Sequence, residues 1–456
     1  MKKNVFFFVS VVVFVVLFYN QSPGINISIF GVMIWLFLSG ITPGVKRTPM
    51  FWGLSAISLV CIGAFAWYGD FICFAALFLS LLVTGFKAFY PRLNVLVLPF
   101  NTAFNYITFI FRVLTPQKWL GVRLSSDGFF KKAISYVLIP AVFAAIFIGV
   151  YTAASDKFAS LFVINLEFDF LQLAVLTVLG FFLMFNFFYS AVPKAFIVCN
   201  GYLKDDFSDG FLQRRNKGFH LLDVASQRRS GEISLILLNA VLIFFIIIYG
   251  IEQFGTANSS GTLSREVHER VYVLILSIVM AIAVIMIYFQ GLLNFDAQSG
   301  LLKKLSFIWI GLNVLLILTV FFRNLEYVNA YGLTFKRIGV FVFLLLSLFG
   351  LFTTWVKLKN RKTNIFLVNR MVWTAFYVLV VSSLINWSWI VTRYNVSHFT
   401  DPDWNYLNSL NYNKQLLNTI YKEKGMANNE MKRNVETERS GKFLSKRLYF
   451  EFLNVQ

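Results

Sequence analysis

Eleven long apolar runs limit what this chain can fold into more than any other feature of its sequence. They cover residues 5–19, 25–41, 51–68, 71–88, 133–154, 170–190, 233–251, 271–290, 305–322, 338–356 and 371–391. A bilayer core about 30 Å thick needs roughly 20 apolar residues in a helix, so most of these runs are long enough to cross it. Of the 456 residues, 58% are hydrophobic and only 14% are charged, which is too apolar for an ordinary soluble protein. The sequence therefore predicts an integral membrane protein.

The pattern within the runs selects the type of membrane fold. Strands of a membrane β-barrel alternate apolar and polar residues, whereas these runs are apolar throughout. We expect an all-α fold, a polytopic transmembrane helical bundle of about 11 spans with a soluble helical tail at the C-terminus. The basic start and apolar run of residues 1–24 also suit a secretory signal, but the run is long and no small-x-small cleavage site follows it. We therefore expect an uncleaved first helix.

Breaks between the runs suggest four regions. These are a four-span region (1–90), an interfacial linker (91–124), a seven-span bundle with a cytoplasmic loop at 191–231 (125–391), and a helical tail (392–456). The linker mixes apolar residues with Asn101, Asn105 and Arg112. It is either a helix lying in the plane of the membrane or a connection packed against the bundle.

The tail carries helix-start residues, with Thr400 or Asp401 as the cap and Pro402 in the first turn. Apolar residues then recur at helical spacing from Trp404 to Tyr421, which predicts an amphipathic helix that ends at Gly425. A second helix is expected over 431–452. A helical hairpin packed against the membrane or a partner is the simplest interpretation.

Lysine and arginine indicate the orientation, because they are retained in short cytoplasmic loops. Their distribution predicts a cytoplasmic N-terminus and, after eleven spans, a C-terminus on the opposite side of the membrane. The tail holds ten Lys and Arg residues, which strains this topology, and an error of one span would reverse its side. The formal net charge of +19 is spread over many short loops, so the lipid bilayer rather than nucleic acid is the expected partner.

His268 and Glu269 stand directly before the run 271–290. A zinc protease needs a second histidine four residues after the first, and that position is Tyr272. A solvated helix end is the simpler interpretation. The three cysteines lack metal-ligand spacing, and no phosphate-binding loop, nucleophile elbow or dinucleotide motif is present in context. We predict no catalytic residue, cofactor or metal site, and lean towards a protein that is not an enzyme.

A second polar cluster, which includes Arg323, Glu326, Tyr331 and Arg337, is expected in a loop between two spans, on the same side as His268. The candidate functional pocket is made of His268, Glu269, Arg323, Glu326, Tyr331 and Arg337. Glu167 and Asp169 are expected on the same side, next to this pocket. Within the spans the polar content is amide: Asn239 and Asn313 fall near mid-membrane, and Asn186 and Asn386 lie nearer span ends. Such residues commonly make hydrogen bonds between helices, worth about 1 kcal/mol or less.

The order of several blocks carries a resemblance: "QRRSGEISLILLNAVLIFF", "VHERVYVLILSIVMAIAVIMIYF", "LEYVNAYGLTFKRIGV" and "TRYNVSH" followed by "DWNYLNSL". Over roughly residues 227–410 the chain resembles an uncharacterised, Bacteroidetes-type family of bacterial multi-pass membrane proteins that carry a domain of unknown function (the DUF 4153/4173 type). The resemblance implies a fold and a location in the bacterial inner membrane, which makes the expected C-terminus periplasmic, but it implies no activity. Within these blocks, Gly332 suits a tight turn before a helix and Thr334 its cap.

Two functional hypotheses follow. The favoured one is a non-enzymatic membrane protein that binds envelope proteins through the tail 392–456 or the loop 191–231. The alternative is a carrier or lipid-handling protein for a neutral or amphipathic solute, with an outward-facing polar pocket around Glu269 and the segment 323–337.

Overall fold

The computed structural model describes residues 2–42, 47–120, 169–208, 223–255, 263–289, 291–425 and 429–453, with scattered positions between 136 and 155. The described residues form helices and no strand, which confirms the predicted all-α helical bundle. The chain divides into two compact units. Unit 1 is Met1–Ile197 with Ser440–Leu448, and unit 2 is Val198–Arg439 with Tyr449–Gln456.

Seven helices in the described part of the chain are long and apolar enough to cross a membrane. They are α3 (Pro49–Tyr68), α4 (Phe71–Phe89), α11 (Phe170–Phe188), α13 (Val224–Gly255), α15 (Gly300–Tyr331), α16 (Phe335–Lys359) and α17 (Asn364–Leu384). These helices support a membrane protein. Only scattered positions of the expected span at 133–154 are described, so the count of eleven spans stays a prediction.

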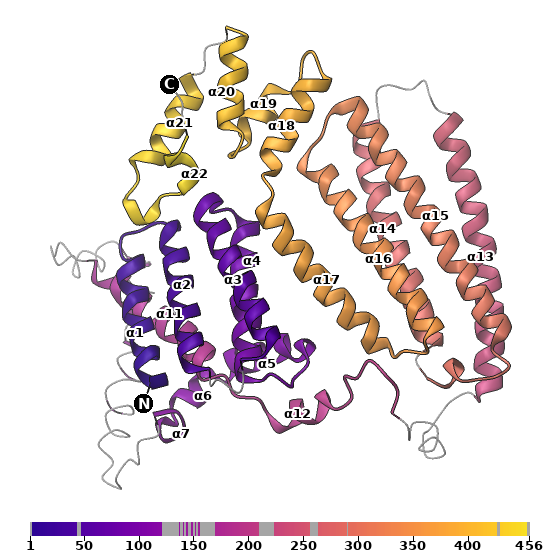
Figure 1. Ribbon diagram of the computed structural model, residues 1–456, viewed down its shortest axis with the longest axis horizontal. Coiled ribbons are helices and arrows are strands. Elements are labelled where there is room, and N and C mark those ends of the chain that lie inside the picture. The colour runs from indigo at the N-terminus through magenta and orange to yellow at the C-terminus, as the bar shows by residue number, and fades with distance from the viewer. Residues whose placement is uncertain are drawn as a thin grey trace. The chain divides into compact units, whose positions relative to one another are not determined.

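Unit 1 is a bundle in which consecutive helices pack together and α11 packs on the first of them. The 17-residue helix α1 (Lys2–Phe18) packs on α2 (Ile25–Ile41) and on α11, α2 packs on α3, and α3 packs on α4 (Figure 1). The tight α3–α4 turn follows from its residues: Gly69 adopts a left-handed φ of 64°, and Asp70 caps α4 by accepting from the Cys73 amide at 2.8 Å. A buried hydrogen bond of 2.9 Å between the hydroxyls of Ser58 and Thr84 joins the two helices.

The segment after α4 is helical and packs within unit 1. It contains η2 (Val95–Val97), α5 (Leu98–Ile107), α6 (Phe109–Val113) and α7 (Pro116–Leu120), and α5 contacts α11. The structure thus shows a connection packed on the bundle. An in-plane position in a membrane stays a prediction.

Unit 2 is built around α15, which contacts α13, α14 (Leu263–Tyr288) and α16, while α16 contacts α17 (Figure 1). Its apolar core includes Ile278 and Ile285 of α14, Leu302 and Leu316 of α15, and Leu351 of α16, each less than 2% exposed. These helices extend beyond the apolar runs, because polar residues at their ends continue the helix.

The predicted bounds of the span 371–391 are wrong, because the membrane-length helix α17 covers Asn364–Leu384 and a separate helix, α18 (Trp387–His398), follows. Ile385 is extended, and the side chain of Asn386 accepts from the Trp389 amide at 2.9 Å. An asparagine that binds the following backbone in this way starts a new helix instead of continuing the old one.

The predicted tail helix from Trp404 to Tyr421 is also wrong as a single element. The structure has α19 (Trp404–Ser409) and α20 (Lys414–Glu423), followed by α21 (Asn429–Ser440), η6 (Phe443–Ser445) and α22 (Leu448–Glu451). Asp403 is the cap of α19, in place of Thr400 or Asp401. The break contains the extended Leu410, and Asn413 there donates to the carbonyl of Leu407 at 2.8 Å.

The turn between α14 and α15 offers a pH-dependent contact. The Asp296 carboxylate accepts from the Gln298 amide at 3.0 Å and from Arg228 Nη1 at 2.8 Å, and these contacts hold the pKa of Asp296 below its usual value. A carboxyl with a lowered folded-state pKa stabilises the protein above its unfolded pKa, and this contribution disappears as the pH falls through the folded value.

We expect Asp296→Asn to lower the free energy of unfolding at pH 7 by about 1 kcal/mol, since solvent at this partly exposed turn screens the pair. The difference from wild type should shrink below about pH 4. Thermal unfolding in detergent between pH 7 and 3 measures this, with Arg229→Gln as a control at a largely exposed neighbour. A difference that is constant with pH would contradict the assignment.

Candidate functional site

Four residues of the predicted pocket gather at the α15–α16 turn in unit 2. Arg323, Glu326 and Tyr331 lie on the last turns of α15, and Arg337 lies on the first turn of α16, so the expected loop location is wrong for all four. Only residues 332–334 separate the helices. Gly332 has a φ of 81° and the side chain of Thr334 caps α16, as the sequence suggested.

The polar groups of this cluster bind one another and the backbone. Arg337 Nη1 donates to the carbonyl of Tyr331 at 3.0 Å and to that of Gly332, and its guanidinium lies 5.9 Å from the ring centroid of Tyr327. Arg323 pairs with Glu326 at 2.9 Å. Because a cation at a helix C-terminus compensates the unpaired carbonyls there, the arrangement stabilises the end of α15.

Residues of the tail in unit 2 bind to the same turn. The Asn395 side chain accepts from the Leu333 amide at 2.6 Å and donates to the Leu333 carbonyl at 2.9 Å. The Tyr406 hydroxyl accepts from the Phe335 amide at 3.0 Å. Leu333 also packs on an apolar cluster of the tail, formed by Val391, Leu407, Leu410, Leu417, Tyr421 and Met431. These contacts fix α18, α19 and α20 to the turn.

The other members of the predicted pocket do not join this cluster in the described structure. His268 and Glu269 are on α14, but their side chains lie outside the described residues, as does Glu167. Asp169 belongs to unit 1 and caps α11 by accepting from the Gln172 amide at 2.9 Å. The outward-facing pocket stays a prediction, and neither of the cavities described below includes any of its residues.

The two mid-span asparagines differ in what they bind. Asn239 Nδ2 of α13 donates to the carbonyl of Leu305 on α15 at 3.2 Å, which is the interhelical contact expected of it. Asn313 Nδ2 instead donates to the backbone carbonyl of Trp309 in its own helix at 2.8 Å. Of these two asparagines, only Asn239 connects helices.

Sequence reasoning missed Lys357, which is fully buried near the end of α16. Its Nζ donates to the Phe289 carbonyl at 2.9 Å, beyond the last turn of α14, and Asn294 Nδ2 donates to the same carbonyl at 2.8 Å. The cation faces the negative end of the α14 dipole, which offsets part of its desolvation.

Unit 1 contains a cavity of about 460 Å³ among α1, α2, α4, α5 and α11, within the range of small-molecule sites. Most of its wall is hydrocarbon, and among the described lining residues there is no acidic or basic side chain. The apolar wall includes Phe14, Phe30, Ile34, Leu77, Leu81, Leu179 and Leu183, and the polar residues include Tyr90, Asn101, Asn105, Asn186 and Ser190.

A hydrogen-bond network organises the polar part of the cavity wall. Tyr90 donates to the Ser190 carbonyl at 2.7 Å, and Asn101 Nδ2 donates to Ser190 Oγ at 3.0 Å. Asn105 binds both the amide and the carbonyl of Ala191, at 2.8 and 2.9 Å. Asn101 is 1% exposed, and its Oδ1 has no hydrogen-bond partner among the described residues.

Arg112 of α6 supports this network. Its Nη1 donates to Asn186 Oδ1 and to the Asn105 carbonyl, both at 3.1 Å, and its Nη2 donates to the Tyr189 carbonyl. The guanidinium also lies 5.1 Å from the ring centroid of Phe185. Arg112 therefore joins α5, α6 and the C-terminal end of α11.

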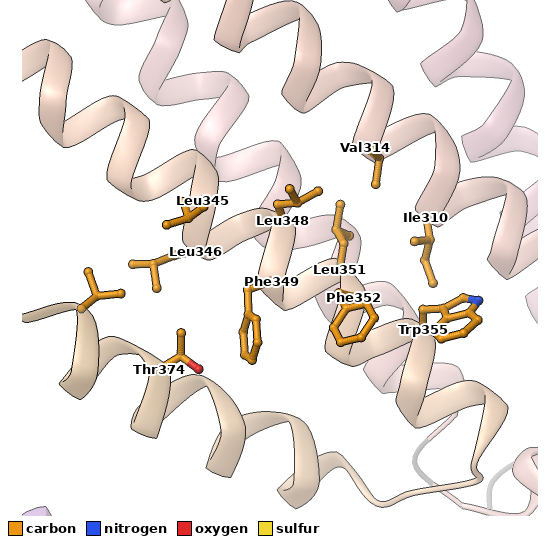
Figure 2. A pocket seen from close by; sticks show the side chains of 11 residues that line it. Ile310, Val314, Leu345, Leu346, Leu348, Phe349, Leu351, Phe352, Trp355 and Thr374 are labelled. Carbon is orange, nitrogen blue, oxygen red and sulfur yellow. The ribbon is translucent and has the colours of Figure 1, made fainter. Parts of the chain in front are cut away.

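Unit 2 has a different hollow, an apolar groove of about 620 Å³ along α15, α16 and α17. Figure 2 shows Leu345, Phe349 and Phe352 of α16 on its wall and Thr374 of α17 across from them. The Thr374 hydroxyl donates to the backbone carbonyl of Arg370 in its own helix at 2.9 Å. The groove thus offers a ligand carbon surface and little to orient a headgroup.

Comparison with protein families gives one finding. The family model "Domain of unknown function (DUF4153)" matches residues 33–418. The chain belongs to this family. The match confirms the resemblance to a family with a domain of unknown function and extends it into the first half of the chain, which the sequence blocks had left outside. The bacterial, Bacteroidetes-type origin stays a prediction. Because the matched range begins in α2 and ends in α20, the DUF4153 region includes the residues of the unit 1 cavity from Ile34 onward. The chain matches no curated protein and no solved structure.

Proposed function

We propose that this DUF4153 protein is a non-enzymatic membrane protein that binds an amphipathic lipid in the unit 1 cavity. The observation that carries the proposal is the combination, in one cavity, of hydrocarbon walls with a buried polar network. Hydrocarbon walls accept an acyl chain, and a few fixed polar groups orient a headgroup. This retains the lipid-handling hypothesis and places it in unit 1 instead of at the α15–α16 turn.

The proposed location is a bacterial inner membrane crossed by several helices, with the N-terminus in the cytoplasm. The distribution of Lys and Arg over the loops supports this orientation. In a membrane, the lipid would enter the cavity from the surrounding bilayer without passing through water.

We expect Leu183→Trp to remove most lipid binding, because the larger ring occupies the cavity. Val178→Trp is a matched control, since Val178 is on the same helix but 64% exposed and not part of the cavity wall. Purified protein in vesicles would be labelled with a diazirine-bearing monoacylglycerol, and the labelled peptides mapped by mass spectrometry. Labelling should concentrate on α2, α4 and α11 in wild type and in the control, and fall at least about tenfold in Leu183→Trp.

A second variant guards against misfolding of the first. Leu179 also lines the cavity but is 42% exposed, so a tryptophan there disturbs packing less. Leu179→Trp with a wild-type unfolding temperature should still reduce labelling. Equal labelling of the wild type and both cavity variants, or labelling spread evenly over all helices, would overturn the proposal.

A second candidate function is the binding of envelope proteins by the tail, which is the hypothesis that the sequence favoured. Its support is the fixed arrangement of α18–α20 on the α15–α16 turn, which makes the tail a preorganised surface. Charge reversal of Lys432 and Arg433, both exposed on α21, should then release an envelope protein that co-purifies in mild detergent. A wild-type protein that purifies without any partner would count against it.

A further inference from the structure

We infer that the unit 1 cavity selects an uncharged lipid with a free hydroxyl, which donates a hydrogen bond to the Oδ1 atom of Asn101. The inference rests on the proposed function, because it names the headgroup chemistry of the same site. It depends on three features of the described residues: an acceptor without a partner, a cavity wall without a charged side chain, and the pairing of the neighbouring Tyr90 and Asn105 side chains with the protein.

The acceptor is Asn101 Oδ1. The Asn101 side chain is held by its own amide nitrogen, which donates to Ser190 Oγ at 3.0 Å. The carbonyl oxygen has almost no accessible surface and no partner among the described residues, and Asn101 belongs to the cavity wall, so a hydroxyl in the cavity reaches this oxygen through a small shift of the side chains around it. Burial of an unpaired acceptor is unfavourable, so a ligand that brings a donor gains more here than at a solvated oxygen.

The charge of the headgroup follows from the walls. Among the described lining residues no side chain is acidic, so a bound ammonium would have no counter-ion. The nearest cation of the polar network, Arg112, would repel an ammonium, and its guanidinium already binds three protein oxygens. A charged headgroup would therefore lose its hydration without a matching partner, whereas a hydroxyl loses little.

Two other polar groups beside Asn101 are already bound to the protein backbone. The Tyr90 hydroxyl donates to Ser190, and both ends of the Asn105 amide bind Ala191. The ligand that fits these features is a neutral lipid with a long hydrocarbon chain and a hydroxyl, such as a monoacylglycerol, a diacylglycerol or a long-chain alcohol.

A matched pair of competitors tests the inference: 1-hexadecanol and hexadecyl methyl ether, which share the chain and the oxygen and differ in the O–H donor. Each would compete with the diazirine-bearing monoacylglycerol for labelling of the wild-type protein in vesicles. We expect the alcohol to compete about three- to tenfold better than the ether, as one buried hydrogen bond predicts.

Asn101→Leu removes the acceptor and keeps much of the side-chain volume. In this variant the preference should fall to about one while both compounds still compete, because the hydrocarbon walls are unchanged. Asn101→Ala is the second variant, in case leucine disturbs the packing of α5. Asn360→Leu, an exposed asparagine at the end of α16, is the control and should keep the wild-type preference.

The outcomes separate this inference from the proposed function. If neither compound competes in wild type, the proposed lipid site fails and the inference with it. Equal competition by both compounds in wild type, better competition by the ether, or a preference that survives in both Asn101 variants would overturn the inference and leave a lipid site without hydroxyl selection.

Discussion

Replacing Arg112 by methionine is expected to destabilise unit 1 by about 3 kcal/mol, the largest effect predicted for a single residue of the bundle. Its guanidinium donates to the Tyr189 carbonyl, to Asn186 Oδ1 and to the Asn105 carbonyl. Hydrogen bonds from a charged donor are worth more than neutral ones, and methionine leaves all three oxygens without this partner. The Tyr189 carbonyl is part of the C-terminal end of α11, which helix geometry leaves without an intrahelical donor.

Thermal unfolding in detergent and hydrogen exchange of α5, α6 and α11 measure this effect. Arg92→Met is the matched control, because Arg92 is exposed in the segment that precedes α5. Arg112→Lys keeps the charge but cannot reach three oxygens from one planar group, so we expect an intermediate loss. An unchanged unfolding temperature in Arg112→Met would show that the network does not depend on the guanidinium.

Replacing Asn395 by leucine is expected to destabilise the contact between the tail and the α15–α16 turn by about 2–3 kcal/mol. The variant loses two hydrogen bonds to Leu333, at 2.6 and 2.9 Å, and leaves the amide and carbonyl of that residue unpaired. Asn395 Oδ1 would also lie only 2.6 Å from a Cβ placed on Gly332, so the side chain fits closely against this glycine. A branched apolar side chain has neither the shape nor the polarity for that position.

Hydrogen exchange is the direct measurement, because loss of these contacts should raise exchange in α18, α19 and α20 before the rest of unit 2 opens. Asn405→Leu, at an exposed position of α19, controls for an added apolar side chain in the tail. Unchanged protection of α18–α20 in Asn395→Leu would mean that the apolar cluster alone holds the tail.

Two features of the fold were predicted correctly from local sequence patterns. The apolar run 25–41 coincides with α2, and Gly332 and Thr334 end and start helices as their residue types suggest. These features depend on contacts within one helix or one turn, so a short window of sequence contains the relevant residues. The break at Ile385–Asn386 was missed because an apolar stretch of ordinary length concealed a side chain that binds the following backbone.

By itself, the sequence determined that the protein is an all-α membrane protein of this family and where most of its helices lie, because apolar run length and capping residues act locally. It also showed Asn101, Asn105 and Arg112 as polar residues in an apolar segment. Only the tertiary structure decided what they do, since their partners Asn186, Tyr189, Ser190 and Ala191 are more than 70 positions away along the chain. Whether a buried polar side chain has all its atoms paired, or leaves one unpaired, depends on which helices pack beside it, and no local pattern contains that information.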